Sequence, residues 1–135
     1  MASNLVPKQE KKLTTDAWAA QTLKVALLTN TFVYNHAVHS TYASLTNEVV
    51  GTGYTAGGAV LAGKTSDYVD STTVKFDATD LPWGPGATFS NVKFAACYDT
   101  VTGLIRALFE FAAAQSCTNS TFTVQWHVSG LARIL

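Results

Sequence analysis

The chain has 135 residues, nine basic and nine acidic, so its formal net charge is zero. Only 13% of the residues are charged, against about 25% in a typical soluble domain. The length suits one domain, and the balanced charge argues against direct nucleic-acid binding, which normally shows a basic stripe. We infer that copies of the chain or a partner cover much of the surface. A neutral, threonine-rich surface is the alternative explanation.

The first half of the chain predicts an arm followed by a few short elements. Residues 1–12 are polar and aperiodic, which predicts an extended N-terminal arm, and residues 13–21 favour a short helix with a capping side chain. Residues 23–30 alternate with apolar side chains on both faces, which predicts a strand inside a sheet rather than at its rim. Residues 39–45 favour one or two helical turns. The glycine-rich segment 48–63 predicts tight turns or an irregular, bulged strand.

The second half is more regular, and alternating apolar residues predict strands at 73–77, 92–98, 104–111 and 121–128. Val74 and Phe76 are expected to face inward. Residues 81–86 predict a turn that carries Trp83. A hairpin turn at 100–103 favours a strand over a helix in the segment that follows, although the helix propensity there is also good. Residues 131–135 predict a last short strand.

About six short strands separated by turns predict an all-β fold, an antiparallel β-sandwich of jelly-roll or Greek-key type with one or two short helices. Long helices do not alternate with the strands, so a parallel α/β fold is not expected. We expect residues 1–12 to form the arm and residues 13–135 to form one β-sandwich domain.

The N-terminus lacks the apolar core of a signal peptide, and no apolar run is long enough to span a membrane. We therefore expect synthesis in the cytoplasm and no membrane partner. Cys97 lies in an apolar run and is expected to pack in the core, whereas Cys117 lies in a Ser/Thr/Asn-rich segment that resembles a turn. We expect both thiols to be reduced, since a disulfide would require their strands to align.

Few residues suggest a metal site or a catalytic carboxylate pair. His36 and His39 have a spacing that suits a metal on a helix, but a third ligand would have to come from Asp67, Asp70 or His127, and nothing fixes that geometry. Paired aspartates at 67 and 70, and at 77 and 80, are routine in turns. We therefore expect no metal and no cofactor.

One string formally matches a phosphate-binding loop. Residues 58–65 fit the pattern G-x-x-x-x-G-K-T, but the residues that follow are typical of strands and turns, whereas this motif requires a helix there. The chain has no G-x-S-x-G nucleophile elbow, and Cys117 with a histidine is only a formal pair. We predict a chance match and no enzyme activity.

Two segments, Leu23–Asn30 (LKVALLTN) and Asn47–Gly58 (NEVVGTGYTAGG), resemble a family of small proteins encoded in the structural regions of tailed phages and prophages. The resemblance continues through a Thr/Val strand at 73–77, a tryptophan-bearing segment at 81–83 and the F-T-x-x-W pattern at 122–126. It covers most of the chain from Leu23 onward, and the glycine-rich string is its most specific part.

The resemblance implies a virion structural protein. We expect a capsid decoration, or cement, protein that binds the major capsid protein on the virion surface as a homo-oligomer, a dimer or trimer. A neck or tail-associated subunit that binds a receptor or glycan is the alternative. The residues expected to contact partners are Leu5, Pro7, Lys8, Lys11 and Lys12 of the arm, together with Tyr54 and Trp83.

Overall fold

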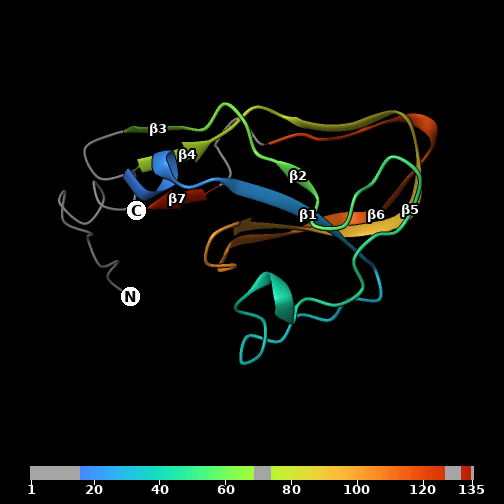
Figure 1. Ribbon diagram of the computed structural model, residues 1–135, viewed down its shortest axis with the longest axis horizontal. Helices are drawn as coiled ribbons and strands as arrows, with labels where there is room; N and C mark the ends of the chain where they lie inside the picture. Colours follow the sequence, from blue (N-terminus) through green and yellow to red (C-terminus); the bar gives the residue numbers. More distant parts are fainter. Residues whose placement is uncertain (1–15, 69–73, 127–131, 135) are drawn as a thin grey trace.

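The computed structural model describes residues 16–68, 74–126 and 132–134 (Figure 1). A helical turn at residues 16–20 precedes the first strand. The remaining elements, in chain order, are β1 (Leu23–Thr29), the 3-10 turn η1 (Tyr42–Ser44), β2 (Ala59–Val60), β3 (Thr65–Tyr68), β4 (Val74–Asp77), β5 (Leu81–Asp99), β6 (Ile105–Val124) and β7 (Ala132–Ile134). The predictions of a short helix near the N-terminus, a mainly β chain and a short final strand are confirmed.

The strands form two antiparallel sheets. The larger has the order β2-β1-β5-β6, and the smaller has the order β3-β4-β7. β1 lies between two neighbours, which confirms that a strand apolar on both faces belongs inside a sheet. The described strands form no closed sandwich or jelly roll.

The prediction of uniformly short strands is wrong, because β5 has 19 residues and β6 has 20. The turn predicted at 81–86 lies inside β5, where the pairing register shifts between Trp83 and Ala87. Cys117, also predicted in a turn, lies inside β6. β5 pairs with β6 both before and after the glycine and proline residues at 84–86. These residues therefore form a bulge within the strand instead of a turn that ends it. The predicted hairpin turn at 100–103 and the strand after it are confirmed.

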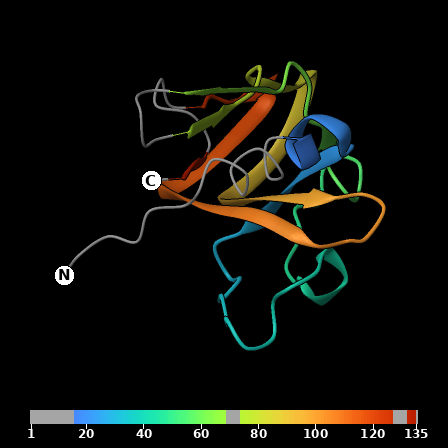
Figure 2. The same ribbon diagram turned by 90° about the vertical axis from the view of Figure 1, so that its left-hand side faces the viewer.

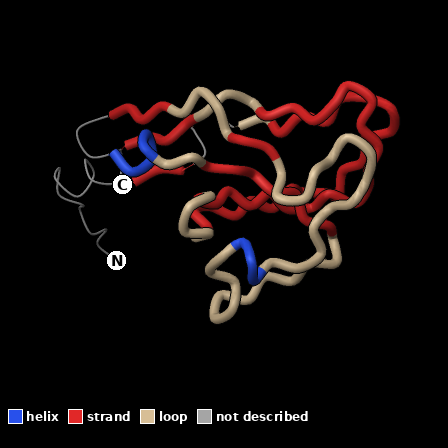
Figure 3. Tube along the Cα trace, viewed as in Figure 1, coloured by secondary structure: helices blue, strands red, loops and turns tan. Residues whose placement is uncertain are grey.

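The ribbon formed by β5 and β6 bends back on itself, so that its two halves lie in two layers (Figures 1 and 3). Near the bend, Val92 pairs with Gln115 and Phe94 pairs with Glu110, so β6 carries extra residues between these pairs. The Lys93 ammonium donates hydrogen bonds to the carbonyl oxygens of Phe111 and Ala112 in this bulge. Lys93 thereby supplies donors that the interrupted ladder lacks.

The core lies between these layers and is built mainly from β1 and β5. Phe76 of β4 is buried, as predicted, whereas the side chain of Val74 lies outside the described residues. Cys97 is fully buried, and burial raises the pKa of its thiol to about 12. Cys97 and Cys117 are both free cysteines in the structure.

The hairpin turn between β5 and β6 depends on the side chain of Asp99, which is 2% exposed. Its carboxylate accepts hydrogen bonds from the Val101 amide at 3.0 Å and the Thr102 hydroxyl at 2.9 Å. These hydrogen bonds hold the pKa of Asp99 below its usual value, and the bond from the Val101 amide has the larger effect. A carboxyl group whose pKa is lower in the folded state stabilises the fold above its unfolded-state pKa, about 3.9.

We therefore expect Asp99 to make its full contribution to the free energy of unfolding at neutral pH. This contribution should be lost as the pH falls from about 4 to below the lower pKa that Asp99 has in the folded state. Urea unfolding between pH 7 and pH 2.5 measures this effect. Asp99→Asn should be less stable than the wild type at pH 7, and the difference should shrink at low pH. A difference that does not change with pH would contradict the assignment.

Candidate interaction surfaces

The predicted contact residues lie in three different settings. Trp83 belongs to β5 and is only 5% exposed, so its ring is part of the core and does not present a face to solvent. Tyr54 is half-buried, with its ring 6.2 Å from Trp83 and 5.9 Å from Phe89 between centroids. The arm residues Leu5, Pro7, Lys8, Lys11 and Lys12 lie outside the described residues.

The glycine-rich string is organised by a half-buried carboxylate, that of Glu48. The hydroxyl groups of Tyr42 and Tyr54 each donate to this carboxylate at 2.6 Å, and the amide of Gly57 donates to it at 2.7 Å. The Tyr54 hydroxyl in turn accepts a hydrogen bond from the Leu27 amide of β1 at 2.9 Å. Glu48 therefore joins the η1 turn to the glycine-rich segment, and Tyr54 joins that segment to β1.

A second contact closes the same network. Tyr98 of β5 donates from its hydroxyl to the Gly57 carbonyl at 2.7 Å, and its ring stacks on Tyr42 with centroids 4.5 Å apart. Burial, followed by the hydrogen bond to Glu48, raises the pKa values of Tyr42 and Tyr54. Both hydroxyls consequently remain protonated donors at neutral pH. The glycine-rich string thus belongs to a structural strap, residues 47–58, whose beginning pairs antiparallel with the end of β1.

Sequence reasoning missed Glu48. The available signal was a lone carboxylate placed six residues from a tyrosine on either side, at positions 42 and 54. No local periodicity requires these side chains to converge, because they lie in irregular backbone.

β3 begins at Thr65, the last residue of the string G-x-x-x-x-G-K-T, and runs to Tyr68, so the described residues after the string form a strand and not a helix, as predicted. The Lys64 ammonium donates to the carbonyl oxygen of Trp18 at 2.8 Å and to that of Gln21. The Trp18 indole donates to the Thr65 carbonyl at 3.0 Å, and its ring packs edge-on against Phe76 at 5.5 Å. Lys64 therefore anchors the helical turn at 16–20.

The two histidines of the loop at 31–41 are engaged locally. His36 shares a 3.2 Å hydrogen bond with the Tyr34 hydroxyl, and the Nδ1 atom of His39 accepts from the Asn35 amide at 2.8 Å. Within the part of the chain that is described, no three His, Cys, Asp or Glu side chains gather as metal ligands. Asp70 and His127 lie outside that part. None of the described helical segments has the length and apolarity needed to cross a membrane.

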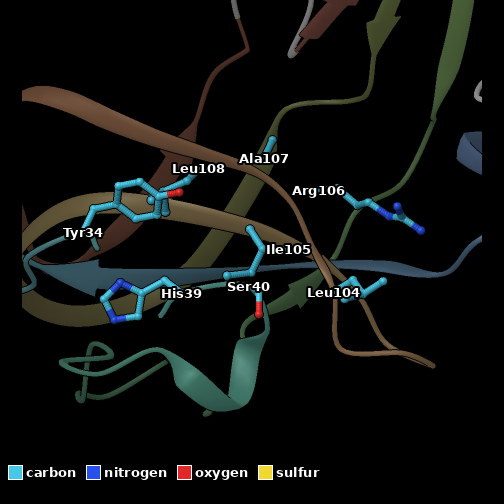
Figure 4. Close-up of a pocket in the computed structure, with 8 residues that line it drawn as sticks. All are labelled: Tyr34, His39, Ser40, Leu104, Ile105, Arg106, Ala107 and Leu108. Atoms are coloured by element: carbon cyan, nitrogen blue, oxygen red, sulfur yellow. The ribbon is translucent and has the colours of Figure 1, made fainter. Parts of the chain in front are cut away.

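A groove of about 420 Å³ lies between the loop at 31–41 and the start of β6 (Figure 4). We call it the tip groove; it is lined by Tyr34, His39, Ser40, Leu104, Ile105, Arg106, Ala107 and Leu108. The two walls are joined by hydrogen bonds from the Ile105 amide to the Ser40 carbonyl at 3.0 Å and from the Tyr42 amide to the Gly103 carbonyl at 2.8 Å. In Figure 4 the Arg106 side chain points away from Tyr34 and His39.

The surroundings of the tip groove are apolar. Most of the large exposed hydrophobic residues belong to its two walls or to the loops that carry them: Val33, Tyr34, Val38, Val101 and Leu104. Exposed apolar residues gathered on the two loops that flank a groove favour an interaction site over a fully solvated face. Figures 1 and 2 place the loop that carries η1 on the side of the molecule away from the small sheet, where the helical turn at 16–20 packs.

Comparison with protein-family models, curated proteins and solved structures finds no match to this chain.

Proposed function

We propose that this protein is a phage virion subunit that decorates and stabilises the capsid by binding the major capsid protein. The observation that carries the proposal is the apolar surface around the tip groove, on a chain with few charges and no net charge. Such a surface favours burial against another protein. The resemblance of the glycine-rich segment and its flanking strands to phage structural proteins supports the choice of partner.

The proposed mechanism is mechanical. The tip-groove surface packs on the major capsid protein, and the proposed arm, residues 1–12, binds a neighbouring subunit, as extended termini can do. The helical turn at 16–20, which follows the proposed arm in sequence, is anchored by Lys64 and Trp18 near the small sheet, away from the tip groove. One subunit therefore has two separate sites with which to bridge neighbours. A stable contact buries about 1,600 Å² in total, and repetition over a shell multiplies modest contacts.

The proposal includes the sandwich arrangement of the strands. The two layers of the β5–β6 ribbon and the small sheet would form a sandwich of jelly-roll type once the subunit is assembled. Self-association as a dimer or trimer in the cytoplasm of the host would precede or accompany attachment to the capsid surface.

Co-sedimentation with capsids that lack the protein tests the proposal. We expect the full chain to bind and both a deletion of residues 2–12 and Val101→Asp to reduce occupancy at least tenfold. Val101 is 87% exposed beside the tip groove, and the matched control is Val50→Asp, because Val50 is 92% exposed in the strap. The control should bind like the wild type.

Electron microscopy of the intact particle then locates the subunit. Density on the capsid surface supports decoration, whereas density confined to the neck or tail would replace the decoration role by the tail-associated alternative. Unchanged occupancy after deletion of the arm would remove the arm from the mechanism, and failure of the full chain to bind shells would overturn the decoration role itself.

A further inference from the structure

β6 forms one edge of the large sheet and is unusually long for an edge strand. On its outer side, the described backbone contacts involve only its beginning, where Ile105 bonds to Ser40 and Leu104 forms a bridge with Thr41. From residue 111 to residue 125 the chain contains no charged side chain and no proline. Proteins commonly protect an exposed strand edge with such residues, so this half of the edge lacks a common protection against pairing.

Some side chains that pack on the core from β6 and the residues after it are only partly buried. Aromatic side chains from both layers of the ribbon pack on the core yet remain partly exposed: Phe109, Phe111, Phe122 and Trp126. A second groove of about 470 Å³, the edge groove, follows β6 here. It is lined by Phe111, Ala112, Gln115, Ser116, Cys117, Ser120, Thr121, Phe122, Thr123 and Gln125. Of these rings, those of Phe111 and Phe122 line the edge groove.

We propose that a second copy of this chain covers the edge groove, by antiparallel pairing of the two β6 strands centred on Phe122. The backbone edge of a strand is complementary to another extended strand, because alternating amide and carbonyl groups must be matched. The irregular backbone at Asn119, where φ is 43°, limits the regular edge to residues 120–124. Two subunits paired here would join their large sheets into one continuous sheet.

The sequence of this segment is suited to pair with itself. Ser120-Thr121-Phe122-Thr123-Val124 places a threonine on each side of a central phenylalanine. In a two-fold arrangement Thr121 lies opposite Thr123 of the partner subunit, and cross-strand threonine pairs stabilise antiparallel sheets. A two-fold contact requires a patch that is complementary to itself. An uncharged patch on a chain of zero net charge meets this requirement without repulsion, whereas a strongly charged partner would find no opposite charge between residues 111 and 125.

Light scattering coupled to size-exclusion chromatography of the purified full chain tests this interface without any capsid, so its result is independent of the virion role. We expect a dimer for the wild type and a monomer for Thr123→Lys, because the variant places an ammonium group at the centre of the contact. The matched control, Thr46→Lys, changes an exposed threonine in the loop before the strap and should remain dimeric. Far-ultraviolet circular dichroism verifies that all three chains are folded.

Alkylation of the native cysteines reports on the same surface. Cys117 lines the edge groove and is half-buried in the single chain, whereas Cys97 is inside the core. We expect a maleimide to react with Cys117 at least tenfold faster in Thr123→Lys than in the wild type, while Cys97 stays unmodified in both until unfolding. A monomeric wild type would overturn the proposal, whatever the reactivity of Cys117. A dimer that Thr123→Lys leaves intact would overturn it equally.

Discussion

Gly58→Ala is expected to destabilise the protein by at least about 3 kcal/mol, or to prevent its folding. A Cβ atom at this position would lie 1.8 Å from the carbonyl oxygen of Val25 in β1, and the backbone has a φ of +79°. Both the overlap and the left-handed conformation act against any residue with a side chain. The atom in the way belongs to the backbone of Val25, a fully buried residue of β1, so it has little freedom to move.

The matched control for this variant is Gly103→Ala. Gly103 has a similar φ of +75°, but a Cβ atom there meets nothing within 4 Å. The control therefore isolates the conformational cost, which we expect to be about 1 kcal/mol. Urea unfolding followed by tryptophan fluorescence measures both values. Equal losses for the two variants would show that close approach of the strap to β1 is not what Gly58 provides.

Glu48→Ala is expected to cost about 3 kcal/mol, since it removes the shared acceptor of the Tyr42 and Tyr54 hydroxyls and the Gly57 amide. Hydrogen bonds to a charged group contribute about 1.5–3 kcal/mol each, and a donor left without an acceptor adds its own desolvation cost. The total loss is smaller than the sum of these contributions, because the site is partly exposed and water can bond to the freed donors. Glu48→Gln keeps one carbonyl oxygen and should lose less.

Glu110→Ala is the matched control for the loss of a carboxylate. Its side chain is 63% exposed, and its ion pair with Lys93 spans 3.6 Å. Exposed pairs contribute little, so we expect a change of at most about 1 kcal/mol. Equilibrium unfolding at pH 7 compares the three variants. If Glu48→Ala were no more destabilising than Glu110→Ala, the strap would be held by its glycine packing rather than by the carboxylate.

Local patterning located much of the sheet structure. The alternation at 23–30, 73–77 and 104–111 predicted strands that the structure contains, because a two-residue period directly reflects which side chains face the core. The hairpin turn at 100–103 was predictable as well, since the residues that form it are close in sequence. These features depend on interactions within a few residues or on burial of one face.

The interior of β5 illustrates what local patterning could not decide. Residues 84–86, Gly-Pro-Gly, are typical of a turn, yet Trp83 pairs with Phe122 before them and Ala87 pairs with Ser120 after them. Pairing with β6 thus keeps β5 extended through residues that would otherwise form a turn and reverse the chain. The same continuation places Trp83 in the core, although its neighbours suggested an exposed loop.

The sequence by itself determined the strand alternation and the scarcity of charge, because each follows from composition or from neighbouring residues. Only the tertiary structure decided that β5 and β6 form one bent ribbon, that Glu48 gathers Tyr42, Tyr54 and Gly57, and that a groove lined by Phe111 and Phe122 follows β6. These features join residues that are distant in the chain or lie in irregular backbone. Their energies depend on which surfaces meet after the sheet has formed, and no local period encodes that.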